Sequence, residues 1–320
     1  MICALDLTFA SEIRTVRSPR RSGIGALTGP ISVGLHLGVH KTATTHLQFS
    51  LRDSREALVA KGVRYYGPDY LRLRGRSIPQ VFGLGDRRQQ RRSVGDQISF
   101  MAKDGNRILL SEENFAGQLI DGRGVITQPL YGTVAGQVQE LADKLVAEGA
   151  ALDLFVALRS PATFVTSCYS QALLGGHFST PTEFATHNPP AMIDWVGFVR
   201  SLAGISNLRQ MFVWRYEDYA AVLPKVLSRM LGADAAKEVA LATAIANQGL
   251  SARALDSVLE AQANGNTWLS PARARKRLPV GPDSPPFGLF GPEELRRDRD
   301  RYASQIAQIA QISELTVIRP

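Results

Sequence analysis

Cysteine is scarce in this chain, because its 320 residues include only Cys3 and Cys168. Two cysteines cannot build a disulfide framework, so we expect a reducing compartment, the cytoplasm. Long hydrophobic runs are missing too, since no stretch approaches the roughly 20 apolar residues that span a bilayer. Five histidines and two distant cysteines show no metal-ligand spacing. The sequence therefore predicts neither a disulfide-rich domain, a membrane span nor a metal site.

The charge balance is strongly basic. The net charge is +8 and the pI is about 9.7, while 44% of the residues are hydrophobic. That hydrophobic content is enough for a substantial core, and the basic balance favours acidic partners such as nucleotides or phosphorylated and sulfated ligands. We expect no nucleic acid among the partners, because no basic pattern with interleaved aromatic residues is present.

Composition also divides the chain. Residues 1–30 place arginines after a short apolar part, which is the wrong order for a secretory signal. We expect a disordered basic leader there, or an artefact of an upstream start codon. Residues 31–320 are expected to form a single domain. Within it, residues 71–107 hold nine Lys/Arg against three Asp/Glu and are interpreted as a basic insertion.

Strand-like and helix-like patterns alternate along the chain. Strand-like runs occupy 31–39, 107–115, 152–160 and 210–218, and the run at 107–115 empties into a polar turn. Helical stripes lie between them, including one over 45–61. Ser160 and Pro161 have the residue types of an N-cap and first helical position. Strands separated by helices imply crossover connections, so we predict a three-layer α/β/α fold with a central, mainly parallel sheet.

The stretch GLHLGVHKTATTHLQ, residues 34–48, combines a strand end, a glycine turn and a helix start. Free N–H groups and the helix dipole favour an anion at such a place, and Lys41 adds a full positive charge. The loop that binds nucleoside triphosphates requires glycine directly before the lysine, but His40 stands there. This loop is therefore related to the nucleotide loop without matching it.

Two motifs resemble those of one family. GVHKTATTHLQ is similar to the G-x-x-K-T-G-T-T-x-L-Q loop of bacterial and carbohydrate sulfotransferases, with Ala43 where glycine is usual. RSPATFVTSCY is similar to their R-x-P-x-x-x-x-x-S-x-Y string and contains Arg159 and Ser167. LLSEENF is more weakly similar to the family's S-S-E-x-F element, which includes Glu113. The resemblance covers roughly residues 31–265.

The resemblance implies a P-loop-like sulfotransferase fold and transfer of a sulfuryl group from 3′-phosphoadenosine 5′-phosphosulfate to a hydroxyl of a carbohydrate or small metabolite, without a metal. It assigns the 3′-phosphate to Arg159 and Ser167. The residues expected to bind the donor's phosphosulfate are Gly38, Lys41, Thr42, Ala43, Thr44 and Thr45. Lys41 is also expected to neutralise charge on the leaving oxygen.

The proton acceptor stays open among three residues. Glu113 is favoured because it follows an apolar strand, and Glu112 and His40 are the alternatives. His177 is a candidate for the wall of the acceptor pocket. Two other functions stay open as well: a nucleotide-dependent kinase on a P-loop scaffold, and a non-catalytic module that binds polyanions. The arginine runs at 72–76 and 87–92 are interpreted as solvated loops, with contact to an anionic glycan or lipid headgroup as the alternative.

Overall fold

A six-stranded sheet forms the centre of the molecule. The computed structural model describes residues 30–85, 92–243, 249–265 and 269–320; most of the expected leader, 1–30, and part of the arginine run at 87–92 lie outside these ranges. The strands are β1 (Ser32–Gly38), β2 (Val63–Tyr66), β3 (Arg107–Ser111), β4 (Ala151–Leu158), β5 (Leu208–Arg215) and β6 (Thr316–Val317).

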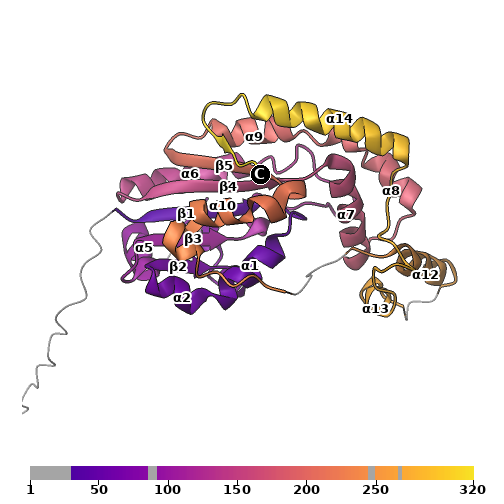
Figure 1. Ribbon diagram of the computed structural model, residues 1–320, viewed down its shortest axis with the longest axis horizontal. Coiled ribbons are helices and arrows are strands. Elements are labelled where there is room, and N and C mark those ends of the chain that lie inside the picture. The colour runs from indigo at the N-terminus through magenta and orange to yellow at the C-terminus, as the bar shows by residue number, and fades with distance from the viewer. Residues whose placement is uncertain (1–29, 86–91, 244–248, 266–268) are drawn as a thin grey trace, which may run out of the picture.

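The strand order is β2-β3-β1-β4-β5-β6, and every neighbouring pair is parallel. Figure 1 shows β2 to β5 in this order from bottom to top. The chain fills one side of β1 with β2 and β3 before it crosses to β4 on the other side. In such sheets ligands bind beyond the carboxyl ends of the strands, where the winding direction changes. That place is the end of β1.

Helices cover both faces, which confirms the three-layer α/β/α prediction. Alternate side chains of β4 divide between the layers: Leu154 and Val156 belong to one buried cluster, and Phe155 and Ala157 to the other. The helices whose side chains join the second cluster are α1 (Thr44–Asp53), α2 (Arg55–Ala60), α10 (Tyr219–Leu231) and α11 (Ala233–Ala236).

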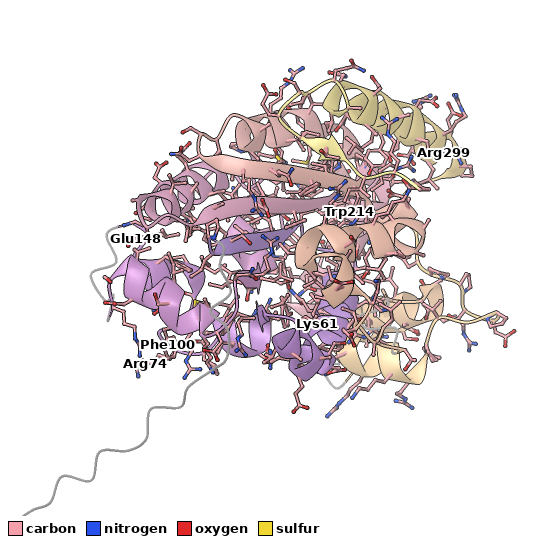
Figure 2. All side chains as sticks on the ribbon, turned by 60° about the vertical axis from the view of Figure 1, so that its left-hand side comes forward. Lys61, Arg74, Phe100, Glu148, Trp214 and Arg299 are labelled. Carbon is pink, nitrogen blue, oxygen red and sulfur yellow. The ribbon has the colours of Figure 1, made fainter. Side chains whose placement is uncertain are left out.

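The first cluster is larger and takes its helical side chains from the opposite layer. Its helices are α3 (Pro68–Leu71), α4 (Ile78–Phe82), α5 (Val94–Ala102), α6 (Val134–Ala147), α7 (Pro161–Leu174), α8 (Pro181–His187), α9 (Trp195–Ala203), α12 (Ala252–Ala263), α13 (Pro271–Arg277) and α14 (Pro292–Ile309). Three short 3₁₀ helices complete the chain: η1 (Glu113–Ala116), η2 (Pro190–Met192) and η3 (Tyr216–Asp218). The two clusters lie on opposite faces of the sheet. Trp214 of β5 is buried in the second cluster, whereas Arg74 and Arg299 reach outward (Figure 2).

Two sequence expectations need adjustment. The helix predicted over 45–61 is interrupted at Ser54, whose hydroxyl accepts a hydrogen bond from the backbone N–H of Ala240 at 2.9 Å. Segment 71–107, interpreted as a basic insertion, contains α4 and α5. Phe82 and Met101 in these helices are fully buried, so part of this segment belongs to the core.

Candidate active site

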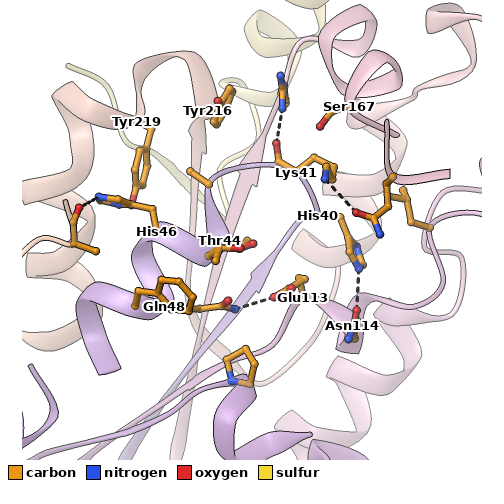
Figure 3. Close-up of a pocket in the computed structure, with 18 of the residues that line it drawn as sticks. His40, Lys41, Thr44, His46, Gln48, Glu113, Asn114, Ser167, Tyr216 and Tyr219 are labelled. Atoms are coloured by element: carbon orange, nitrogen blue, oxygen red, sulfur yellow. Dashed lines mark hydrogen bonds between the residues drawn. The ribbon is translucent and has the colours of Figure 1, made fainter. Parts of the chain in front are cut away.

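A cavity of about 1310 Å³ opens at the carboxyl edge of the sheet. Its lining includes residues that lie within three positions of the ends of four neighbouring strands: Lys41 after β1, Glu113 after β3, Arg159 after β4 and Tyr216 after β5. Figure 3 shows Lys41, Glu113, Ser167 and Tyr216 around this space. The two sequence motifs, more than a hundred residues apart, therefore border one cavity.

The end of β1 brings the loop against Glu113. Gly38 has φ +92°, and a Cβ on it would lie 3.1 Å from the Cβ of Glu113. A larger residue would be strained in this conformation and would also push the two strands' ends apart. Gly38 therefore allows a close approach between the lysine loop and the carboxylate, and it does not itself line the cavity.

The backbone conformation of the loop is of a kind that suits an anion. Lys41 and Ala43 have positive φ values of 66° and 63°, with Thr42 between them. Alternating right- and left-handed residues point successive N–H groups into one concavity, which suits an anion. The Leu47 N–H donates to the Ala43 carbonyl at 3.3 Å in the first turn of α1. In general, the first N–H groups of a helix have no partner within the helix, which suits an anion. Ala43 thus occupies a left-handed position, which glycine adopts more readily than alanine.

The threonines of the loop differ in position. Thr44 and Thr45 line the cavity. Thr42 is buried, and its hydroxyl donates to the Val39 carbonyl at 2.7 Å. The side chain of Thr42 therefore stabilises the turn and does not face the cavity, so only its N–H is available to the expected phosphate group.

Lys41 and Arg159 are joined through the backbone. The Arg159 guanidinium donates to the Lys41 carbonyl at 2.8 Å, and its Nε donates to the Thr163 hydroxyl at 3.0 Å. The guanidinium also stacks 4.4 Å from the centre of the Tyr216 ring. Burial lowers the pKa of Lys41, and the positive charges of Arg159 and Arg275 act in the same direction. Cations gathered in a partly buried space are typical of a site for an anion that bears more than one charge.

The start of α7 is held from three distant elements. Ser160 takes the N-cap position, as predicted, but the carboxylate of Asp298 in α14 accepts from both the Ser160 hydroxyl and the Ala162 N–H, at 2.6 and 3.1 Å. The Trp195 indole donates to the Arg159 carbonyl, and Glu217 accepts from the Ser160 N–H, both at 2.8 Å. These bonds fix the backbone that carries Arg159.

The two candidate glutamates have different surroundings. Glu112 is buried and caps η1 by accepting from the Asn114 N–H at 3.0 Å. Glu113 lines the cavity, and its Oε2 accepts from the Gln48 amide at 2.7 Å (Figure 3). Of these two glutamates, Glu113 lines the cavity, and Glu112 holds the backbone of η1.

His40 is engaged at both ring nitrogens. Its Nε2 contacts the Asn114 side-chain oxygen at 3.1 Å and its Nδ1 contacts the Tyr131 hydroxyl at 2.9 Å. Burial lowers the pKa of His40, which the Asn114 hydrogen bond and the charge of Glu113 only partly oppose. A neutral imidazole can donate at Nε2 and accept at Nδ1, so neither nitrogen is free for an incoming proton. This geometry favours Glu113 over His40 as proton acceptor.

Several residues at or beside the cavity are not singled out by the sequence. Gln171 accepts a 3.4 Å hydrogen bond from Lys41 Nζ, Asn114 and Tyr131 hold His40, and Arg72 contacts both glutamates. Gln48 is the last residue of the first motif, so its position in the string could have pointed to it. Arg72 had no such signal, because its arginine-rich surroundings resemble a solvated loop. His177 lies on the wall of the cavity, and its contact with an acceptor stays a prediction.

Two kinds of feature are absent from the described residues: a metal-binding group and a membrane-spanning helix. Among them, no group of three or more His, Cys, Asp and Glu residues is arranged to hold a metal ion. No helix in the described parts of the chain has the length and apolar character needed to cross a membrane.

Comparisons with known proteins give distant likenesses. No family model and no curated protein matches the sequence. Among solved structures, a sulfotransferase from Alicyclobacillus acidocaldarius aligns over 91% of this chain and 98% of its own, with 12% identity and a TM-score of 0.40. A structure from the PezAT toxin–antitoxin system of Streptococcus pneumoniae aligns over 89% and 90%, with 10% identity and a TM-score of 0.27. Both TM-scores are below 0.5, and neither likeness says what this protein does.

Proposed function

We propose that the protein is a sulfotransferase that moves a sulfuryl group from 3′-phosphoadenosine 5′-phosphosulfate to a hydroxyl of a carbohydrate or other small metabolite. The observation that carries the proposal is the meeting of both motifs at one cavity. Lys41 with its anion-binding loop lies beside Arg159 and Ser167, and Glu113 lines the same space. The type of reaction and the donor are inferred from the resemblance of the two motifs to those of sulfotransferases.

The described residues suit a donor with two phosphate ends. The loop's N–H groups and Lys41 would receive the 5′-phosphosulfate, while Arg159 and Ser167 would receive the 3′-phosphate. Lys41 and Arg159 are tied by the 2.8 Å bond between them, so the two ends of the donor site would keep a constant separation. The residues expected to bind the donor are thereby pre-organised.

The transfer itself is an in-line displacement at sulfur. The acceptor oxygen forms a new S–O bond while the S–O bond to the 5′-phosphate breaks, and 3′,5′-ADP leaves with the electron pair. Lys41 would neutralise the charge that develops on the leaving oxygen. Glu113 would take the proton of the acceptor hydroxyl.

The acceptor is proposed to enter over β3 and β2. Arg159 and Ser167 occupy the β4 side of Lys41, which leaves the opposite side for the acceptor. There the cavity wall contains Glu113, Phe49, Tyr65 and Pro68. We propose the cytoplasm as the compartment, which agrees with the free, buried thiol of Cys168.

Ligand-induced thermal shifts test the donor assignment. 3′,5′-ADP should bind about ten- to a hundredfold more tightly than 5′-AMP, because one charge-assisted phosphate contact contributes on the order of 1.5–3 kcal/mol. Ser167→Ala should reduce the difference in affinity between 3′,5′-ADP and 5′-AMP. Binding of 3′,5′-ADP should not require Mg²⁺. Equal affinity of the wild-type protein for both nucleotides would contradict the assignment of Arg159 and Ser167. A shift given by ATP with Mg²⁺ alone would favour the kinase.

A further inference from the structure

Arg72 reaches both glutamates from the far side of the cavity. It follows α3, and its Nε and Nη2 donate to the two carboxylate oxygens of Glu112 at 2.9 and 2.8 Å. The same Nη2 donates to Glu113 Oε1 at 2.8 Å. One guanidinium therefore bridges two adjacent carboxylates, and it also lines the cavity.

The Arg72 guanidinium offsets the repulsion between the two adjacent carboxylates. The side chains of Glu112 and Glu113 are only 8% and 14% exposed, so two like charges lie next to each other with little water around them. Without a cation, the repulsion and the loss of solvation would both favour the protonated form of Glu113. Arg72 is the cation that contacts both, among the residues described.

The geometry also gives the three residues separate tasks. Glu112 is anchored to the backbone of η1, and its bidentate bond with Arg72 fixes the plane of the guanidinium. Arg72 then donates to Oε1 of Glu113, and Gln48 donates to its Oε2. The carboxylate at the cavity is thus held in one orientation.

We propose that Arg72 is a positioning residue for the transfer reaction, which keeps Glu113 ionised and oriented toward the acceptor and uses Glu112 as its anchor. This inference rests on the proposed function, because it assumes that Glu113 accepts the proton. Arg72 is not assigned to the donor: Lys41 and Arg159 serve that end of the cavity.

The electrostatic surroundings of Glu113 agree with this role. Burial pushes the pKa of Glu113 up, but hydrogen bonds from Gln48 and from its own backbone, together with the charge of Arg72, hold the pKa below its ordinary value. The remaining titratable groups that interact with Glu113 or contact the same guanidinium are Glu112, Lys41, His36, Tyr65 and Tyr131. Removal of the Arg72 charge should therefore raise the pKa of Glu113.

The experiment compares Arg72→Gln, Arg72→Lys and the control Arg74→Gln, which removes an exposed arginine two residues away (Figure 2). The first readout needs no activity: the ¹³C carboxyl signal of Glu113, assigned with Glu113→Gln, is titrated by NMR in the ligand-free protein. The second readout is the pH profile of kcat/KM for sulfuryl transfer, whose acid limb reports the essential base of the free enzyme. Binding of 3′,5′-ADP is measured in parallel.

We expect Arg72→Gln to move the Glu113 titration and the acid limb of the profile to higher pH, and to lower turnover about 10- to 100-fold through misplacement of the carboxylate. Arg72→Lys should keep the position of the acid limb better, since it preserves the charge, and Arg74→Gln should match the wild type. Unchanged 3′,5′-ADP binding would show that the donor site is intact.

An unmoved Glu113 titration in Arg72→Gln would overturn the inference, as would a uniform loss of turnover with an unmoved acid limb. Failure of the proposed function would look different. In that case the wild-type protein would not bind 3′,5′-ADP in preference to 5′-AMP, whatever the titration of Glu113.

Discussion

Replacement of Glu113 by glutamine is the most direct test of the proposed chemistry. The change keeps the shape of the side chain and removes its basicity. Loss of a positioned general base costs about 10²–10⁴-fold in turnover, which corresponds to roughly 2.7–5.4 kcal/mol at about 1.36 kcal/mol per tenfold change. Binding of 3′,5′-ADP should stay nearly intact, because Lys41 and Arg159 are untouched.

The structure adds a second consequence of this substitution. Both oxygens of Glu113 accept hydrogen bonds, from Arg72 at 2.8 Å and from Gln48 at 2.7 Å. An amide offers only one acceptor, so its NH₂ group must face one of these two donors. The lost bond to a charged group should cost about 1.5–3 kcal/mol of stability, unless Gln48 turns its amide over. A lowered Tm with retained nucleotide binding is therefore expected.

Glu112→Gln is the matched control, because Glu112 is the adjacent carboxylate but lies outside the lining of the cavity. The assay is transfer to an acceptor at saturating donor, together with calorimetric binding of 3′,5′-ADP. Glu112→Gln should reduce turnover much less than Glu113→Gln. Near-normal turnover in Glu113→Gln, combined with its loss in His40→Asn, would refute the reasoning and make the histidine the proton acceptor.

Three further predictions follow from the loop and the sheet. Lys41→Ala should depress turnover strongly, because Lys41 meets a charge that is largest in the transition state. Ser167→Ala should chiefly weaken donor binding, because the 3′-phosphate is unchanged by the reaction. Steady-state kinetics that show lost turnover but normal donor affinity in Ser167→Ala would argue against this division. Ala43→Gly should not destabilise the protein and should raise stability by up to about 1 kcal/mol, because a Cβ at φ +63° is strained; a lower Tm would contradict it. His36 is buried and its pKa is lowered to about 4 by burial, so the unfolded chain binds a proton first as the pH falls and stability is lost from about pH 6.5 downward. Between pH 7 and 5 that loss should be about 2 kcal/mol, measured by denaturant unfolding, and His36→Phe should remove it; an unchanged pH slope in the variant would speak against the assignment.

The architecture was predictable because its signals are local. Apolar runs ending in polar turns marked β1, β3, β4 and β5, and the intervening helical stripes implied a parallel sheet. The sequence did not reveal the interruption at Ser54, nor the hydrogen bond that the Ser54 hydroxyl accepts from Ala240, 186 residues away. Periodicity reports which face of an element is apolar and contains no information about such a partner.

The candidate site was predictable to a similar degree. Lys41, Arg159 and Ser167 stand in two strings that each contain a strand end and a helix start, and the carboxyl ends of parallel strands meet at one edge. Glu113 was preferred over Glu112 and His40 only by position. The structure separates them by their partners: the backbone of η1 for Glu112, and Asn114 with Tyr131 for His40.

The sequence by itself therefore determined the layered fold, the lysine loop at the end of β1 and the second motif at the start of α7, because each depends on neighbours a few residues apart. Only the tertiary structure decided which carboxylate faces the cavity and which cation holds it. Arg72 lies 41 residues before Glu113, and Asp298 lies 138 residues after Ser160. Contacts at such separations depend on how the layers pack on the sheet, and no periodic pattern in the chain encodes them.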